Sequence, residues 1–117
     1  MEVSDQEEAQ MAKYLLKVSY SVDGLKGVMK GGGTARVKAV ETALAGVGGS
    51  LESFYFAFGG DDVYVIAEVP DHTAAIAMAA AVGTSGAVSS YETVVLLSPS
   101  DVDKAMEVAV NYAPPGT

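Results

Sequence analysis

The chain has 117 residues, of which half are hydrophobic, and it carries a formal net charge of −8. This length predicts one domain with a hydrophobic core, and the negative charge argues against partners such as nucleic acid or an anionic membrane. Cysteine is absent and His72 is the only histidine, so disulfides and thiolate metal sites are excluded and we expect no metal or other cofactor.

The start of the chain is acidic and lacks the basic residues and apolar segment of a signal peptide. We therefore expect no export and a cytoplasmic location in a bacterium or archaeon. We divide the chain into a flexible lead-in over residues 1–12, a single domain over 13–112 and a frayed C-terminus over 113–117. Residues 13–20 alternate in the manner of a half-buried strand and predict the first element.

The next stretch, residues 21–33, is rich in glycine and predicts a long loop, with room for a short helical turn over 25–29. Loops of this length without regular structure are often functional. An apolar stripe then predicts a helix over residues 34–47, with Thr34 as its N-cap.

The strongest local signal is a β-hairpin between Ser53 and Val69. Phe54, Phe56 and Phe58 fall on one face at strand spacing, and the return strand alternates in the same way after a glycine and aspartate turn at residues 59–62. The opposite faces are also largely apolar, which is expected when both faces of a sheet are buried.

Three further elements complete the chain. Asp71 is a good N-cap for a helix over residues 71–83, and a strand is predicted over residues 87–97. The sequence from Ser98 to Asp101 resembles a capping box and predicts a last helix that ends near Tyr112.

This order of elements is the split βαβ arrangement, so we predict an α+β fold: a ferredoxin-like βαββαβ domain with a four-stranded antiparallel sheet and an added C-terminal helix. Helices should cover one face of the sheet. Because the other face is also apolar, we expect a second subunit to cover it, as in dimeric α+β barrels. The expected partner is thus another copy of the chain, in a dimer or larger homo-oligomer.

Several motifs occur together in one order: KYLLKVSYSVDGLKG from Lys13, GGGTAR from Gly31, GGSLESFYFAFG from Gly48 and VPDHTAA from Val69. With them the chain resembles the GYD-domain family of small prokaryotic proteins over roughly residues 13–98. The resemblance implies a ferredoxin-like, dimeric α+β barrel and no settled biochemical function. Where the family signature reads Gly-Tyr-Asp, this chain has an aspartate in place of the tyrosine.

A candidate anion site lies where the glycine-rich stretch meets the following helix. Backbone N–H groups at a helix N-terminus, together with a guanidinium, can hold a carboxylate or phosphate. Six of the seven cations also lie between residues 13 and 38, where they either attract an anion or only keep the chain soluble. The pattern is not a P-loop. The candidate ligand-binding residues are Lys30, Gly32, Gly33, Thr34 and Arg36.

The alternative at this junction is purely structural. The glycines would then shape the turn, Thr34 would cap the helix, and Arg36 would pair with Glu41 or with a carboxylate across an interface.

Four tyrosines are candidates for lining a cavity between the sheet and a partner, where a phenol can bind or protonate a ligand. They are Tyr20, Tyr55, Tyr64 and Tyr91. The alternative is ordinary packing of tyrosine on a half-buried sheet.

Two further features suggest chemistry but have simpler explanations. Asp61 and Asp62 are adjacent carboxylates, yet aspartate is a routine turn residue and no further metal ligand is near them in sequence. His72 could act as a general base, although a histidine in the first turn of a helix is commonly a surface residue.

Two functions from different classes remain open. One is a non-catalytic oligomeric module that binds a small anionic or aromatic metabolite or serves only as an assembly unit. The other is a cofactor-independent monooxygenase or isomerase acting on an aromatic substrate in the barrel cavity, which rests on analogy of fold. The sequence shows no nucleophile with a partnered base, so we favour the binding module and predict no catalytic residues.

Overall fold

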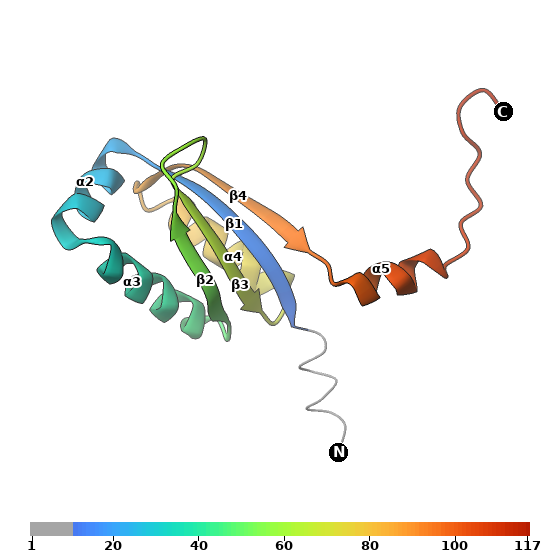
Figure 1. Cartoon of the computed structure of the whole chain (residues 1–117), viewed down its shortest axis with the longest axis horizontal. Helices are drawn as coiled ribbons and strands as arrows, with labels where there is room; N and C mark the ends of the chain where they lie inside the picture. The colour runs from blue at the N-terminus through green and yellow to red at the C-terminus, as the bar shows by residue number, and fades with distance from the viewer. Residues whose placement is uncertain (1–10) are drawn as a thin grey trace, which may run out of the picture.

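A computed structural model describes residues 11–117 (Figure 1). The predicted lead-in over residues 1–12 thus lies almost wholly outside the described part of the chain. Among the described residues, no helix is long and apolar enough to cross a membrane. The elements are the strands β1 (Ala12–Tyr20), β2 (Ser50–Phe56), β3 (Val63–Val69) and β4 (Val88–Leu96), and the helices α2 (Val22–Gly31), α3 (Gly33–Gly46), α4 (His72–Gly83) and α5 (Pro99–Met106).

The four strands form one antiparallel sheet in the order β2-β3-β1-β4. Helices α3 and α4 lie against one face of this sheet (Figure 1). The two central strands, β1 and β3, are thus paired on both edges, and each crossover carries a helix to the same side. This arrangement confirms the predicted ferredoxin-like α+β fold.

The hydrophobic core lies between the sheet and these two helices. In β3 every second residue is buried, from Val63 to Val69, because successive side chains of a strand point to opposite faces. Tyr14, Leu16 and Val18 of β1 share that face. Leu44 of α3 is completely buried, and α4 contributes Ala74 and Met78. Alternation in the strands therefore decides which side of the sheet the helices cover.

The other side of the sheet, here called the open face, is covered by no helix in the described part of the chain. Leu15 stands at its centre and pairs with Ile66 of β3 and Val94 of β4. Lys13 and Lys17 flank Leu15 on the same strand, and each lies within ion-pair distance of two acids. The open face thus combines an apolar centre with lysines that are already neutralised.

The prediction of a loop over residues 21–33 is wrong, because α2 occupies most of it. Ser21 caps the helix: its hydroxyl accepts a hydrogen bond from the Gly24 N–H at 3.0 Å. Val22, Leu25 and Val28 recur at helical spacing. The glycines in this stretch argue against a helix, since each lowers helix propensity by about 1 kcal/mol relative to alanine, and for this reason the sequence predicts a loop.

The N-cap predicted for the next helix is also wrong. Helix α3 begins at Gly33, and Gly32 occupies the N-cap position with φ of 88° and no side-chain cap. A positive φ of this size suits glycine, which lacks the β-carbon that would make it strained. Two helices separated by one residue require such a sharp turn, and this places Thr34 inside the first turn of α3.

Phe58 is not part of a strand, so the prediction that it shares a strand face with Phe54 and Phe56 is wrong. Strand β2 ends at Phe56, and Phe58 lies in the connection with φ of 54°. Its ring is more than half exposed and stacks on that of Phe56, with centroids 5.7 Å apart. The strand alternation ends where the six-residue connection between β2 and β3 begins, so it no longer determines the direction of the Phe58 side chain.

The last helix is shorter than predicted. The capping box is confirmed: Ser98 Oγ accepts from the Asp101 N–H and the Asp101 carboxylate accepts from the Ser98 N–H, each at 3.1 Å. However, α5 ends at Met106, and the residues up to Tyr112 form no regular secondary structure. These residues include two valines, which have low helix propensity, and all six are exposed, so burial in the described part of the chain does not offset it.

Candidate functional site

A cavity of about 260 Å³ lies inside the domain, between the core face of the sheet and helices α3 and α4. Its walls are mostly apolar and come from four strands and both helices, because the small side chains of α4 leave space against the sheet. Leu16, Val40, Phe54, Val65, Met78 and Val88 are among the wall residues.

A second hollow of about 350 Å³ adjoins this cavity, since both are lined by Tyr20, Arg36, Ser85 and Ala87. Helix α2 supplies part of its remaining wall, including Asp23. We call it the mouth. The apolar cavity is therefore reached through a more polar opening between α2 and the turn that precedes β4.

Arg36 is the charged residue of the cavity wall. It projects from the first turns of α3 and is half-buried. Among the described residues it forms no ion pair within 4.0 Å, so the alternative pairing with Glu41 is not found. The carboxylate of Asp23, which also lines the mouth, is not within that distance either. A guanidinium without a partner beside apolar walls is a favourable place for an anion.

Tyr20 lies next to this guanidinium on the other wall of the mouth. Burial raises the pKa of its phenol, and the positive charge of Arg36 opposes that rise, while Asp62 adds to it. The hydroxyl thus stays protonated at neutral pH and remains a hydrogen-bond donor.

Tyr91 of β4 brings an unusual polar group to the cavity. Its hydroxyl is buried, and it has no hydrogen-bond partner among the described residues. Burial raises the pKa of Tyr91 to about 12. Buried hydroxyl groups are nearly always paired, and an unpaired one costs stability, so this hydroxyl is an unsatisfied donor in the wall of the cavity.

The other residues of the predicted anion site do not join Arg36 in the cavity. Lys30 and Thr34 are exposed at the junction of α2 and α3. The N–H of Gly32 is already used, because it donates to the Val28 carbonyl at 2.7 Å and so ends α2. Gly33 begins α3. The structure therefore separates the guanidinium from the glycine junction that suggested the site.

The four candidate tyrosines divide between the two faces of the sheet. Tyr20 and Tyr91 line the cavity on the helix side. Tyr55 and Tyr64 are cross-strand partners on the open face, and Tyr55 is 70% exposed. Strand alternation explains the division, since residues paired across strands share a face.

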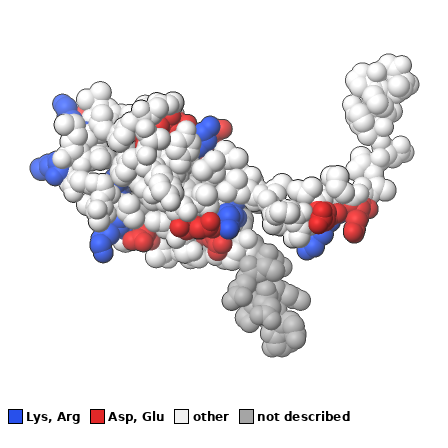
Figure 2. All heavy atoms as spheres, viewed as in Figure 1, with Lys and Arg blue, Asp and Glu red and all other residues white. Residues whose placement is uncertain are grey.

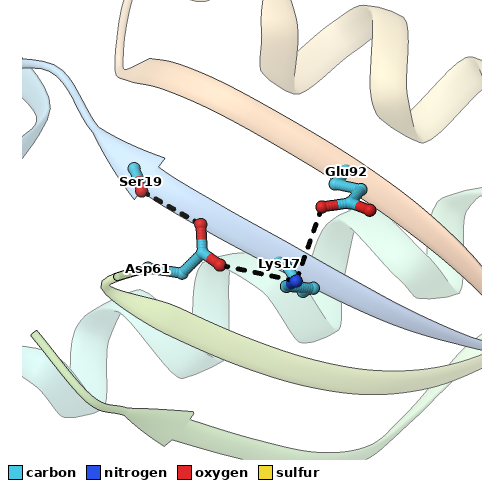
Figure 3. Close-up of polar contacts among 4 residues, drawn as sticks. All are labelled: Lys17, Ser19, Asp61 and Glu92. Atoms are coloured by element: carbon cyan, nitrogen blue, oxygen red, sulfur yellow. Dashed lines mark hydrogen bonds and ion pairs between the residues drawn. The ribbon is translucent and has the colours of Figure 1, made fainter. Parts of the chain in front are cut away.

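The adjacent aspartates tie the β2–β3 connection to the end of β1. Asp61 accepts a hydrogen bond from Ser19 Oγ at 3.2 Å and lies 3.8 Å from Lys17 Nζ, which also approaches Glu92 (Figure 3). Asp62 accepts from the backbone N–H of Tyr20 at 2.9 Å. In residues 11–117 no three potential metal-binding side chains of His, Cys, Asp or Glu gather together.

His72 lies away from the cavity. It is the first residue of α4 and is exposed, and its Nδ1 is 2.7 Å from the hydroxyl of the buried Tyr14. It therefore joins the helix start to β1 and does not reach the cavity or its mouth.

The sequence model of the GYD domain matches residues 14–106, from the first buried residue of β1 to the last residue of α5. The chain belongs to the GYD domain family. This confirms the resemblance predicted from the motifs and extends it through α5. Neither a curated protein nor a solved structure matches the chain.

Sequence reasoning missed the part of the site that α2 supplies to this GYD domain. Asp23, Gly24 and Gly27 line the mouth, yet all three lie in the stretch predicted as a loop. Two signals point to the helix: Ser21 in the N-cap position and the apolar spacing from Val22 onward.

Proposed function

We propose that this GYD-domain protein binds a small molecule with an apolar or aromatic body and one anionic group, held in the cavity between sheet and helices. The observation that carries the proposal is the half-buried Arg36, which lines an apolar cavity without an ion-pair partner among the described residues. A planar guanidinium binds a carboxylate or a phosphate through two parallel hydrogen bonds.

The size and lining of the cavity suit the rest of such a molecule. Its volume of about 260 Å³ exceeds the roughly 150 Å³ of an apolar protein cavity that holds benzene. Arg36 and Tyr20 line both the cavity and the mouth, whereas Tyr91 lines only the cavity. The anionic group would thus lie near the mouth and the apolar body inside.

Tyr91 adds a means of recognition inside the cavity. Once its ring turns toward the bound molecule, its buried and unpaired hydroxyl would donate a hydrogen bond to a carbonyl, hydroxyl or ring nitrogen there. A ligand that satisfies this group gains more than one that leaves it buried and unpaired. We therefore expect an aromatic acid with a second polar substituent to bind more tightly than the simple aromatic acid.

The alternative of a cofactor-independent monooxygenase or isomerase has less support in this cavity. Such chemistry needs a group that removes a proton from the substrate. Of the residues that line the cavity, the ionisable ones are Tyr20, Arg36 and Tyr91, and the pKa of both phenols is raised. Groups of this kind bind and orient a ligand better than they remove its protons.

Fluorescence titration with 2-naphthoate tests the proposal, since the chain has no tryptophan to obscure the signal. We expect saturable binding of 2-naphthoate and much weaker binding of neutral 2-naphthamide. Arg36→Gln should weaken naphthoate binding by about 1.5–3 kcal/mol, the scale of a charged hydrogen bond. The matched control is Lys38→Gln, which removes the same charge from an exposed position of α3.

Equal binding of naphthoate and naphthamide would contradict the proposal, as would an unchanged affinity of the Arg36→Gln variant. A separate assay follows quinol-type aromatic substrates in air with the wild-type chain and with Tyr91→Phe. Turnover that depends on Tyr91 would favour the enzymatic alternative over a binding module.

A further inference from the structure

The end of the chain leaves the domain instead of packing on it. After β4 the chain enters α5, which points away from the sheet, and the following residues continue outward (Figure 1). We call residues 99–112 the C-terminal arm. Every residue of the arm is exposed.

The arm exposes several large apolar side chains to solvent. Val102 and Met106 lie one helical turn apart on the same side of α5 and are 44% and 75% exposed. Figure 2 shows charged side chains gathered along one edge of the segment that contains α5, and by helical spacing Lys104 lies nearly opposite Val102 and Met106. Beyond the helix, three more large apolar residues are largely exposed: Val108, Val110 and Tyr112. A surface of this kind is typical of a segment that is buried against a partner.

Local interactions stabilise the start of α5. The capping box between Ser98 and Asp101 satisfies two backbone N–H groups, and Pro99 starts the helix with a suitable φ. The family match also runs to Met106, so α5 belongs to the domain. The apolar side of this helix, which is exposed in the described part of the chain, is therefore available for a contact with a partner.

The same chain carries a second apolar surface, the open face of the sheet, which no helix of residues 11–117 covers. Its centre is formed by Leu15, Ile66 and Val94, which are half-buried. The lysines around this centre can be covered without leaving a lone cation: Lys13 Nζ is 2.7 Å from Glu52, and Lys17 Nζ is 3.5 Å from Glu92.

We infer that the C-terminal arm of one chain packs on the open face of a second copy, whose arm returns the contact. Both complementary surfaces occur on one chain, so a two-fold axis makes the exchange reciprocal and closes the assembly as a dimer. Helix α5 leads away from the sheet of its own chain, which places the arm toward a neighbour (Figure 1). A stable interface of this kind buries about 800 Å² per partner.

Substitutions on the two sides of α5 test this contact in the full chain. Native mass spectrometry and light scattering should show a dimer for the wild type. Val102→Glu combined with Met106→Glu should raise the dimer dissociation constant by at least about tenfold. Lys104→Glu is the matched control, because it makes the same change in net charge on the opposite side of the helix. This control should remain dimeric.

A monomeric wild type at high micromolar concentration would overturn the inference. A double variant that dimerises as the wild type does would also overturn it, because the arm would then lie outside the interface. If Leu15→Glu dissociates the dimer but the arm variant does not, the sheets pair without the arms, and the proposed arm contact is wrong.

Disulfide trapping gives an independent test, since the chain has no native cysteine. A chain with Met106→Cys is mixed with a chain carrying cysteine at Leu15, Ile66 or Val94, and the mixture is oxidised. We expect a mixed disulfide with at least one of these three, in higher yield than with a Lys104→Cys chain. Equal yields from the two arm positions would overturn the inference.

Discussion

Gly24 of α2 lies directly against the carbonyl group of Ala87, so that a β-carbon at position 24 would overlap the carbonyl oxygen. The contact is held by Ser21, whose N–H donates to the Ala87 carbonyl at 3.0 Å and whose hydroxyl donates to the Gly86 carbonyl at 2.6 Å. These bonds fasten the start of α2 to the turn before β4. Both segments line the mouth, so their separation sets the width of the opening.

Replacing Gly24 by alanine should therefore force α2 away from this turn. We expect a loss of about 1–3 kcal/mol in the free energy of unfolding, the usual scale of overpacking. Urea denaturation measures this loss. Gly27→Ala is the control, because nothing lies within 4 Å of a β-carbon there, and it should stabilise the helix by about 0.5–1 kcal/mol. Equal effects of the two substitutions would show that the contact with Ala87 is unimportant.

Tyr91→Phe removes the unpaired buried hydroxyl and should raise the free energy of unfolding of the ligand-free protein by about 1 kcal/mol. The same variant should bind hydroxylated naphthoates more weakly than the wild type does. Tyr55→Phe, on the exposed open face, should change neither quantity. A destabilised Tyr91→Phe variant would indicate that the hydroxyl has a partner in solution.

Tyr91 also predicts how stability changes at alkaline pH. The phenol ionises near pH 10 in the unfolded chain but at about 12 in the folded one, so the folded state keeps its proton longer. As the pH rises from 10 toward 12, the unfolded chain loses this proton while the folded chain keeps it, so the free energy of unfolding falls. Denaturation at several pH values should show a steeper alkaline loss for the wild type than for Tyr91→Phe. Parallel curves would argue against the raised pKa.

The adjacent aspartates should differ in their contribution to stability. Asp62→Ala removes a charged acceptor of the Tyr20 N–H and should cost about 1.5–3 kcal/mol. Asp61→Ala removes a long ion pair with Lys17 and a hydrogen bond to Ser19, and should cost about 1 kcal/mol or less (Figure 3). Denaturant midpoints at neutral pH compare the two variants. The reverse order would mean that the Lys17 and Ser19 contacts hold the connection in place.

The hydrogen bond between Tyr14 and His72 should contribute to stability and not to ligand binding. His72→Ala leaves the mostly buried Tyr14 with one partner fewer and should cost about 0.5–1.5 kcal/mol. Because His72 lines neither the cavity nor its mouth, naphthoate affinity should remain unchanged. A large loss of affinity in this variant would place His72 in the binding mechanism.

The amino-acid sequence alone determined the sheet, α4 and the caps of α4 and α5. Strand alternation and cap residues act over a few neighbouring positions, so the order of elements, the ferredoxin-like fold and the Asp71 and Ser98 caps could be predicted. The family could also be predicted, because its motifs are runs of adjacent residues.

Only the tertiary structure decided where the candidate site lies. Arg36 and Tyr91 are far apart in sequence, and they line one cavity because α3 packs on the sheet to which β4 belongs. Helix α2 could not be predicted because its glycines weaken the local helical signal. One of them, Gly24, is required by its contact with Ala87, which is more than sixty positions away in the sequence. Cavities and unpaired groups arise from packing between distant segments, and no local pattern in a sequence encodes them.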